Sequence, residues 1–486
     1  MAKTNPQNRK VDHEVKVSTF TTTPNQRGVG TGDSRCVNVL FEKIEDPLTQ
    51  DKIIQVIKRP GLANSTQPPA GAATGRGLYA WDKTGKIYSC FNNKLYSGTT
   101  DLGMTLAAST GRVWFAETPE TAAAQLLIVS DGADNYNITT GDVATQIDEN
   151  DDAQYPTSNL GSIVYLDGYL FQGQSDGQIW NTDLDSATSW VSTSFLSAGQ
   201  HGDALEALHI QKDQILAFGK TTIAFYFDTG NPTGSPILDV KQNVLDVGLS
   251  TKNSLAWGGN VCAFVAESAP WGDGTRSVWS ISALGSAKEI STHVINRFLA
   301  AEGSSMSSCT AWMERVAGQL IYVLNLSSAN RTFVYSFNNE TWTEWEIAAG
   351  SAKFNGIAAT SLNGTIYVQD ATNGRIYTFP PTTYQDSGTN FTVTLQGNRD
   401  HRNTLKRKFE RYLDVDGDTT TGNLAVSWSD NDYSSFSTAR NIDMSVVNKR
   451  LTNLGSFKQR AYRYTYTDNY ALRLRKVLYT YDEGRI

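Results

Sequence analysis

Short runs of β-branched and aromatic residues, broken by Gly, Asn and Asp, make up most of the chain. Runs of this kind, bounded by turn residues, indicate β-strands. Pairs of runs joined by a turn recur at steps of 37 to 59 residues, in the ranges 85–97, 125–139, 162–183, 214–228, 260–282, 319–345 and 364–379. A repeat of about 45 residues with four strands per unit is typical of β-propeller blades. The pattern therefore predicts an all-β chain with a β-propeller of about six or seven blades.

The two ends of the chain depart from this repeat. The first 30 residues are polar and show no periodicity, which predicts an extended arm, and two strand-like runs follow before Pro60-Gly61. This dipeptide marks the start of the propeller. Beyond the turn-rich segment 380–390, apolar and polar residues alternate at period two, as in an antiparallel β-sandwich. The predicted domains are an N-terminal arm with docking strands at 1–58, a β-propeller at 59–390 and a C-terminal β-sandwich at 391–486.

One segment, residues 286–304, carries a helical pattern instead. Its apolar residues fall on one helical face: Ile290, Val294, Ile295, Phe298 and Leu299. Gly303 supplies a stop signal. We therefore expect one helix inserted in a mostly β frame.

Charge is distributed unevenly over the 486 residues. The chain has 42 Lys+Arg and 49 Asp+Glu, a formal net charge of −7. Residues 391–486 hold 16 basic and 11 acidic residues, a net of +5, so the remainder carries −12. An acidic body with a mildly basic C-terminal domain is not the profile of a general nucleic-acid binder. It suits a surface along which DNA passes without adhering, because like charge repels phosphate.

The cysteines, Cys36, Cys90, Cys262 and Cys309, are far apart in the sequence and form no C-x-x-C pair. This spacing argues against a disulfide scaffold or a zinc site and favours buried free thiols. The N-terminus has no apolar signal-peptide core, and no apolar run approaches the length of a membrane span. We expect a protein made and folded in a cytoplasm, without a membrane span.

Two acidic clusters are candidate cation sites. The first, residues 148–152, is better explained as a solvated loop. In the second, Asp414, Asp416 and Asp418 depart from the calcium-loop pattern, and the Asp-Gly step predicts a hairpin turn instead. No nucleophile elbow, zinc-protease motif or phosphate-binding loop is present. We therefore predict a protein that is not an enzyme, without catalytic residues, cofactor or metal.

A basic run, Lys406, Arg407, Lys408 and Arg411, is the most prominent positive feature. It is a candidate contact to an acidic partner subunit or to DNA phosphate. The alternative is a solvated edge strand whose lysines and arginines prevent aggregation.

Several segments together resemble one protein family. DSRCVNVLFEK followed by KRPGL, and WSDNDYSSFSTARNI near the C-terminus, are similar to its motifs, although Asp432 and Tyr433 stand where the family has two glycines. The family is the tail hub or nozzle protein of short-tailed bacteriophages, also called the packaged-DNA stabilisation or head-completion protein. The segments that carry the resemblance are 33–62, 215–230, 244–249, 288–299, 331–345, 428–442 and 454–468.

The resemblance implies a structural virion protein of the phage tail. Family members form a hexameric ring below the portal and adaptor rings, extend the DNA channel, retain packaged double-stranded DNA without reading its sequence, and attach a needle, fibres or spikes. The polar arm of residues 1–30 would then become ordered on docking to a neighbouring copy. The alternative is a glycan-binding or glycan-hydrolysing β-propeller protein, and a hydrolase would need a pair of carboxylates in its central pocket.

Overall fold

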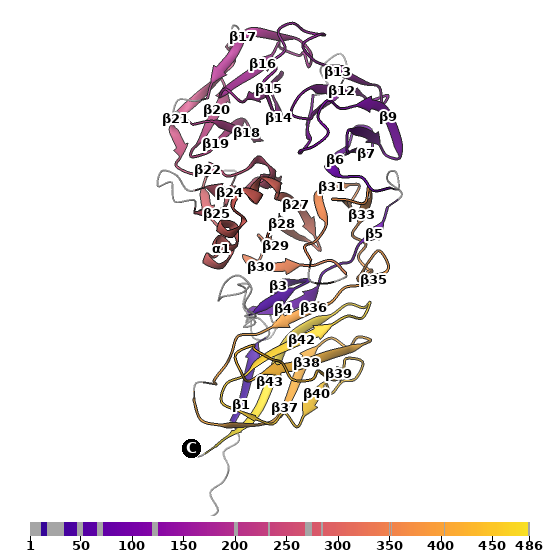
Figure 1. Cartoon of the computed structure of the whole chain (residues 1–486), viewed down its shortest axis with the longest axis vertical. Helices are drawn as coiled ribbons and strands as arrows, with labels where there is room; N and C mark the ends of the chain where they lie inside the picture. The colour runs from indigo at the N-terminus through magenta and orange to yellow at the C-terminus, as the bar shows by residue number, and fades with distance from the viewer. Residues whose placement is uncertain are drawn as a thin grey trace, which may run out of the picture.

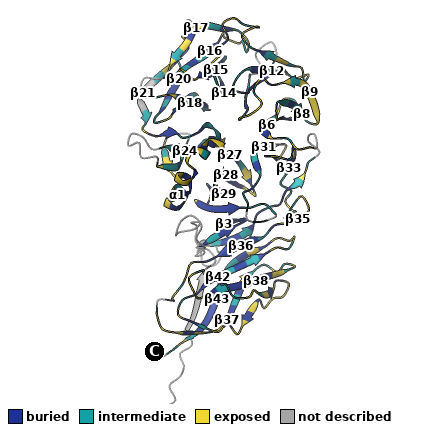
Figure 2. Ribbon diagram, viewed as in Figure 1, coloured by how far each residue is buried: buried dark blue, intermediate teal, exposed yellow. Residues whose placement is uncertain are grey.

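The fold is taken from a computed structural model, in which a ring of β-sheets occupies one end and a second β domain, with the C-terminus, the other (Figure 1). Buried residues follow the strands of both parts (Figure 2). The structure describes residues 11–16, 34–45, 52–65, 71–118, 125–198, 203–231, 234–267, 275–282, 285–348, 350, 352–402 and 404–484.

Seven sheets follow one another along the described parts of residues 75–378 and surround the centre of the ring. Each is built chiefly from strands that are neighbours in the sequence, which is the connectivity of propeller blades. Each of the seven predicted hairpins lies within one of these sheets. The chain is therefore all-β and contains a β-propeller, as the sequence predicts.

The first blade contains β6 (Gly75–Trp81), β7 (Lys86–Phe91), β8 (Lys94–Ser97) and β9 (Thr100–Thr105), and the second contains β10 (Trp114–Glu117), β11 (Leu126–Ser130), β12 (Asn135–Thr139) and β13 (Ala144–Ile147). The third blade contains β14 (Asn159–Leu166), β15 (Tyr169–Gln174), β16 (Gln178–Thr182) and β17 (Trp190–Ser197), and the fourth contains β18 (Leu205–Gln211), β19 (Gln214–Gly219), β20 (Ile223–Asp228) and β21 (Ile237–Leu245). The fifth blade contains β22 (Gly248–Leu249), β23 (Ala256–Gly258), β24 (Val261–Glu267), β25 (Arg276–Ser282) and β26 (Ala287–Glu289). The sixth contains β27 (Thr310–Val316), β28 (Gln319–Leu326), β29 (Arg331–Ser336) and β30 (Thr341–Trp345). The seventh contains β31 (Gly356–Leu362), β32 (Thr365–Asp370), β33 (Ile376–Thr378) and β5 (Ala63–Asn64).

The ring closes by pairing the two ends of the propeller segment. β5 lies antiparallel to β33, with Ala63 opposite Thr378 and Asn64 opposite Tyr377. The last blade is thus completed by the strand that precedes the first. Apolar side chains fill the space between neighbouring blades, as where Phe218 meets Phe264 edge-on with ring centroids 5.2 Å apart.

Two further sheets pack face to face beside the propeller. One contains β1 (Val11–Lys16), β3 (Val39–Glu45), β4 (Lys52–Lys58), β37 (Lys408–Gly417), β40 (Arg450–Thr452), β41 (Ser456–Phe457) and β43 (Arg473–Glu483). The other contains β2 (Arg35–Val37), β36 (Val393–Gln396), β38 (Asn423–Ser429), β39 (Arg440–Asp443) and β42 (Ala461–Tyr466). Their common core includes Val415 and Val477 from the first sheet and Val426 and Tyr464 from the second.

The second of these sheets is continuous with a propeller blade. β30 pairs in parallel with β2, Val37 lying opposite Glu344, so that one nine-stranded sheet runs from β27 to β39. The strands β2, β3 and β4 belong to the same two sheets as residues 393–483. The small hairpin β34 (Gln385–Asp386) and β35 (Thr389–Asn390) lies between the propeller and the C-terminal strands.

The helix begins later than the sequence pattern predicts. α1 spans His293–Glu302, and the Thr292 side chain accepts a hydrogen bond from Ile295 N at its N-terminus. The first part of the predicted segment forms β26 instead, because it pairs with β25. The predicted apolar face is buried and Gly303 ends the helix, with φ 54°.

The predicted hairpin at residues 413–422 is wrong. β37 and β38 flank this turn but belong to opposite sheets of the sandwich, so the chain crosses between sheets there.

In the turn after β38, Asp432 and Tyr433 both take positive φ, 62° and 64°, the region that glycine prefers. Ser429 Oγ and Asn431 Oδ1 accept backbone N–H groups and hold this turn closed.

Among the described helices, none has the length and apolar character needed to cross a bilayer.

Gly61, at the junction of the two domains, has no space for a side chain. A Cβ there would lie 2.2 Å from the carbonyl oxygen of Gln385. We expect Gly61→Ala to lower the free energy of unfolding by about 1–3 kcal/mol, because the backbone must shift. Denaturant unfolding measures this. The control is Gly141→Ala, whose Cβ would meet Thr139 Oγ1 at 3.8 Å; equal losses in both variants would contradict the predicted clash.

Candidate functional site: a buried arginine junction and a closed propeller centre

A single arginine ties the propeller to the sandwich. Arg59 follows β4, and its side chain is 0% exposed. Nε donates to Asn38 Oδ1 at 2.9 Å, and the two Nη atoms donate to the Asp386 carboxylate at 3.0 and 2.6 Å. The carbonyl oxygens of Pro60 and Glu346 accept the remaining bonds. The guanidinium is therefore fully paired, as burial of its charge requires.

Asn38 organises the other side of this junction. Its backbone takes φ 58°, a conformation that asparagine tolerates better than most residues. Its N–H donates to Glu344 O at 2.8 Å and its side-chain amide to Thr392 O at 2.8 Å. Its Oδ1 also accepts from Glu346 N at 3.0 Å. One residue thus joins the strand β30 to the segment that begins β36.

Aromatic rings and a second cation complete the junction. The Arg59 Cζ lies 3.8 Å from the Phe391 ring centroid and 5.4 Å from that of Trp345. The buried Lys58 ammonium donates to Asp468 O at 2.7 Å and lies 4.4 Å from the Phe391 centroid. Burial, with the neighbouring Arg59 charge, lowers the pKa of Lys58 to about 8. These contacts connect the two domains.

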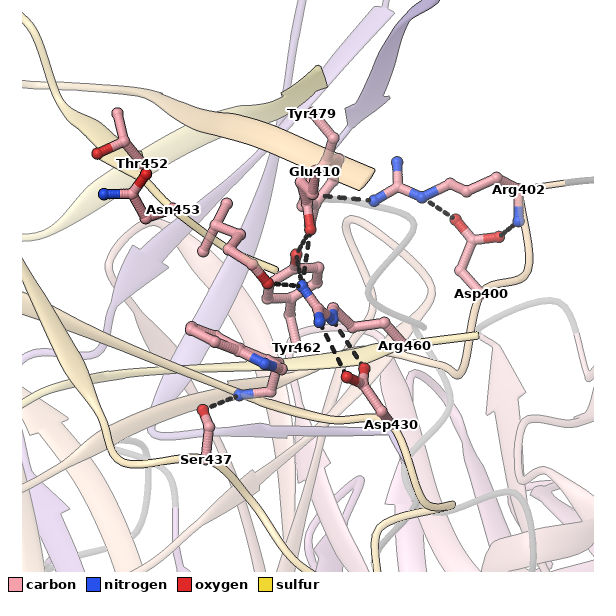
Figure 3. A network of polar contacts seen from close by, with 12 residues as sticks. Asp400, Arg402, Glu410, Asp430, Ser437, Thr452, Asn453, Arg460, Tyr462 and Tyr479 are labelled. Carbon is pink, nitrogen blue, oxygen red and sulfur yellow. Dashed lines mark hydrogen bonds and ion pairs between the residues drawn. The ribbon is translucent and has the colours of Figure 1, made fainter. Parts of the chain in front are cut away.

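A second buried network links the two sheets of the sandwich (Figure 3). Glu410 of β37 is 0% exposed and accepts from Arg460 Nη1 at 3.0 Å and from Tyr462 OH. Arg460 also holds the Asp430 carboxylate at 2.7 and 2.9 Å, and Arg402 lies 3.8 Å from the other oxygen of Glu410. Burial raises the pKa of Glu410. Asp430 and Arg460 lie in the segments 428–442 and 454–468 that resemble the family motifs, but the sequence does not show that they meet Glu410, because the partners lie on different strands.

The four basic residues predicted as a contact site do not form one patch. Lys408 is 0% exposed, and its Nζ donates to three backbone carbonyls, those of Thr404, Lys406 and Lys458. Lys406 and Arg407 are exposed, and Arg407 donates to Ser456 Oγ at 3.2 Å. Arg411 pairs with Asp482 at 2.5 Å on the surface.

The aspartates predicted as an alternative cation loop have arginine partners. Arg450 makes a bidentate contact with Asp414, at 2.6 and 2.7 Å. Arg475 lies 3.4 Å from Asp416 and 2.5 Å from Asp418. Positive charge thus compensates these carboxylates. In the other acidic cluster, Asp148 and Asp152 accept backbone N–H groups of their own loop.

Side chains bridge the centre of the propeller. Arg112, before β10, donates through Nη1 to Leu255 O at 2.6 Å and to Lys252 O at 3.4 Å, on the far side of the ring. The indoles of Trp114 and Trp257 stack with centroids 5.9 Å apart and planes 18° apart. These contacts join the second blade to the fifth across the axis. Beside the bridge lies a cavity of about 650 Å³.

The lining of this cavity has the aromatic and polar groups of a ligand site but one carboxylate among its described residues, Glu314. Glycoside hydrolysis commonly uses two carboxyl groups about 5–10 Å apart. The geometry therefore does not support the hydrolase alternative.

His209 packs against the bridge and is 6% exposed. Its ring centroid lies 4.8 Å from that of Trp257. Burial and the Arg112 charge lower the pKa of His209 to about 3. The imidazole therefore remains neutral in the folded chain near neutral pH.

Replacement of Arg59 should cost far more stability than replacement of a surface arginine. Arg59→Ala leaves the Asp386 carboxylate without its cation and removes one of the two donors to Asn38 Oδ1, so we expect a loss of about 3–5 kcal/mol. Arg411→Ala removes an exposed pair and should cost about 1 kcal/mol or less. Denaturant titration of both variants measures the difference, and similar losses would refute the assigned role of Arg59.

Stability should fall with acidification in a way that depends on His209. The unfolded imidazole binds a proton as pH falls through about 6.5, whereas the folded one does so only near pH 3. Folding stability is therefore lost as pH decreases through this window, by roughly 2 kcal/mol between pH 7 and 5. His209→Gln should remove this part of the pH dependence, measured by denaturant unfolding at both pH values. Trp257→Phe, which alters the same contact without removing a titrating group, should retain it; equal slopes in both variants would contradict the assignment.

Comparisons with known proteins bear on the fold and the family. The chain is similar to virginiamycin B lyase from Staphylococcus aureus, at 13% identity and a TM-score of 0.42, over 67% of this chain and 98% of that chain. It is also similar to the WD40 β-propeller domain of Doa1, at 12% identity and a TM-score of 0.37, over 66% and 97%. Neither likeness carries an argument about activity. A search of curated proteins gives no match.

A family match covers more than half of the chain. Residues 54–384 match the phage stabilisation family described as Bacteriophage P22 Gp10, β-propeller. The matched segment begins within β4 and ends just before β34, so it spans all the blades described above. The chain belongs to this family of bacteriophage stabilisation proteins.

Proposed function

We propose that this chain is a structural protein of a short-tailed bacteriophage tail, present in the virion as a ring of about six copies below the portal and adaptor. The ring extends the DNA channel, retains the packaged genome and attaches a needle, fibres or spikes. Membership of the phage stabilisation family is the observation that carries this proposal. The role needs no cofactor and no catalytic residue.

The closed centre of the propeller supports a channel enclosed by several copies. The Arg112 and Trp114 contacts to Leu255 and Trp257 cross the axis of the ring of blades. A DNA duplex therefore has no path through a single propeller. A cyclic arrangement of copies creates a central opening by repeating one heterologous contact until the ring closes.

The net charge of the chain supports a surface along which DNA passes without binding tightly. The formal net charge is −7. The exposed arginines of β37 and β43 are matched with carboxylates, as in the pairs Arg411–Asp482 and Arg475–Asp418. The charges of Arg411 and Arg475 are thus compensated, which lowers their capacity to release counterions from DNA, and that release is the main source of non-specific affinity.

The N-terminal arm has a defined anchor in the fold. β1 pairs antiparallel with β43, from Val11 opposite Tyr481 to Lys16 opposite Lys476. The rest of the predicted arm, residues 1–10 and 17–30, lies outside the described residues. We propose that this arm docks to a neighbouring copy of the chain.

Addition of the purified chain to DNA-filled heads that lack it tests the proposal. With adaptor present, we expect the protein to bind, to retain DNA against leakage, and to reach about six copies per head. DNA release by nuclease sensitivity and protein stoichiometry by quantitative gel analysis are the measurements. A chain without residues 1–30 should keep its folded propeller but fail to bind.

Two results would overturn parts of this proposal. Failure of the intact, folded chain to bind adaptor-bearing heads rejects the tail role. Full binding and DNA retention by the truncated chain leaves the tail role intact and rejects the docking function of the arm.

A further inference from the structure

The cavity at the propeller centre is built from five of the seven blades. Its walls come from β6, β10, β23, β27 and β31 and from the loops that lead into them. Its volume of about 650 Å³ falls within the range of small-molecule sites, roughly 300–1,000 Å³. The loops that lead into β6, β10 and β27 add exposed residues that carry hydroxyl groups: Thr74, Ser109, Thr110, Ser307 and Ser308.

Arg112 has hydrogen-bond donors that none of the described residues uses. It lines the cavity, and its bonds to the carbonyls of Lys252 and Leu255 use Nη1 alone. Among the described residues, Nε and Nη2 have no hydrogen-bonding partner, and no carboxylate forms an ion pair with Arg112. Burial lowers the pKa of Arg112 to about 10, so it still carries its charge at neutral pH. An Nε–Nη2 edge is the fork that binds a carboxylate with two parallel hydrogen bonds.

Trp257 provides a fixed apolar platform beside this fork. Trp257 is 40% exposed, although the Trp114 ring stacks on its ring and the His209 ring centroid lies 4.8 Å from its own. The Arg112 Cζ lies 5.3 Å from the Trp257 ring centroid. A ring that is held in place and still exposed can bind a flat apolar ligand face without first losing conformational freedom.

The charge of the lining selects a ligand with a single negative charge. The other lining arginine, Arg76, donates to the carbonyls of Asn92, Ala108, Thr110 and Gly111. Glu314 adds one negative charge. One available guanidinium fork suits one carboxylate, whereas nucleotide phosphates and DNA bring several charges that need several cations.

We propose that the propeller cavity binds an acidic saccharide, with the sugar carboxylate on Nε and Nη2 of Arg112, the pyranose ring against Trp257, and ring hydroxyls directed to the serine and threonine rim. This binding site goes beyond the ring-forming role and does not depend on it. It would let the same subunit that closes the channel contact a surface polysaccharide.

Ligand titration of the full chain tests the proposal. Glucuronic acid, galacturonic acid and N-acetylneuraminic acid are the probes, and glucose and galactose are the matched neutral sugars. By calorimetry or saturation-transfer NMR, we expect at least one acid to bind about tenfold more tightly than the neutral sugars, with affinity falling as salt is raised.

Matched variants separate the two contacts. Arg112→Lys keeps the charge but loses the fork, and Trp257→Ala loses the platform; each should weaken binding of the acid by about tenfold. Arg375→Lys and Trp180→Phe change the same residue types outside the cavity and should leave binding unchanged. Thermal unfolding identifies a variant that has lost its fold, and Trp257→Phe then replaces Trp257→Ala, with retained binding expected.

Four outcomes would overturn the proposal: no acidic sugar binds; acidic and neutral sugars bind equally; folded Arg112→Lys binds as the parent does; or adenosine monophosphate displaces the acid at equal or lower concentration. None of these outcomes affects binding of the chain to phage heads, so the proposed tail role is tested separately.

Discussion

Burial of the Arg59 guanidinium is the constraint that most of the domain arrangement depends on. A buried arginine is tolerated only when its charge and its donors are all paired. Its acceptors come from the adjacent Pro60, from Asn38, 21 residues away, and from Glu346 and Asp386, 287 and 327 residues away. These segments must therefore meet before the charge can leave water. In the folded chain, the buried charge thus holds the end of the propeller segment, the start of the sandwich and the turn of Asn38 together.

The same junction makes the propeller and the sandwich one mechanical unit. Domains joined by a linker and a small polar interface usually move relative to each other. Here the blade that ends in β30 continues through β2 into the sandwich by backbone hydrogen bonds, and Arg35 pairs with Glu344 at 2.7 Å beside that step. Bending at the junction would break a sheet and expose a buried carboxylate that is 1% exposed.

Local patterns were sufficient for the blades but not for long-range pairing. A hairpin such as 162–183 can be predicted from the sequence because its strands and turn are contiguous. The alternation around Val415 and Val426 is equally clear, yet both residues face one core from different sheets, so the pattern could not tell a hairpin from a crossing. Residues 287–289 carry part of a helical pattern but pair with β25, since backbone pairing decides their conformation.

The candidate sites depended on long-range contacts even more strongly. Arg35 and Arg59 stand in segments that resemble the family motifs, but their partners Glu344 and Asp386 are more than 300 residues away. The basic run at 406–411 is prominent by composition, but Lys408 donates hydrogen bonds to backbone carbonyls and is not a surface contact. Composition finds charge, whereas only the fold shows whether that charge is already paired.

This distinction separates the two arginine sites of the molecule. Arg59 has every donor occupied by the protein, so its interaction energy goes into holding the domains together. Arg112 donates hydrogen bonds to the protein through one nitrogen only, and it forms no ion pair with any Asp or Glu among the described residues. Burial nevertheless removes water from its guanidinium. A stability role alone would favour pairing with a carboxylate from the neighbouring blades. An arginine that lines a cavity beside an exposed indole, and whose remaining donors no described residue uses, is the arrangement expected of a binding group, because a ligand can supply the missing charge.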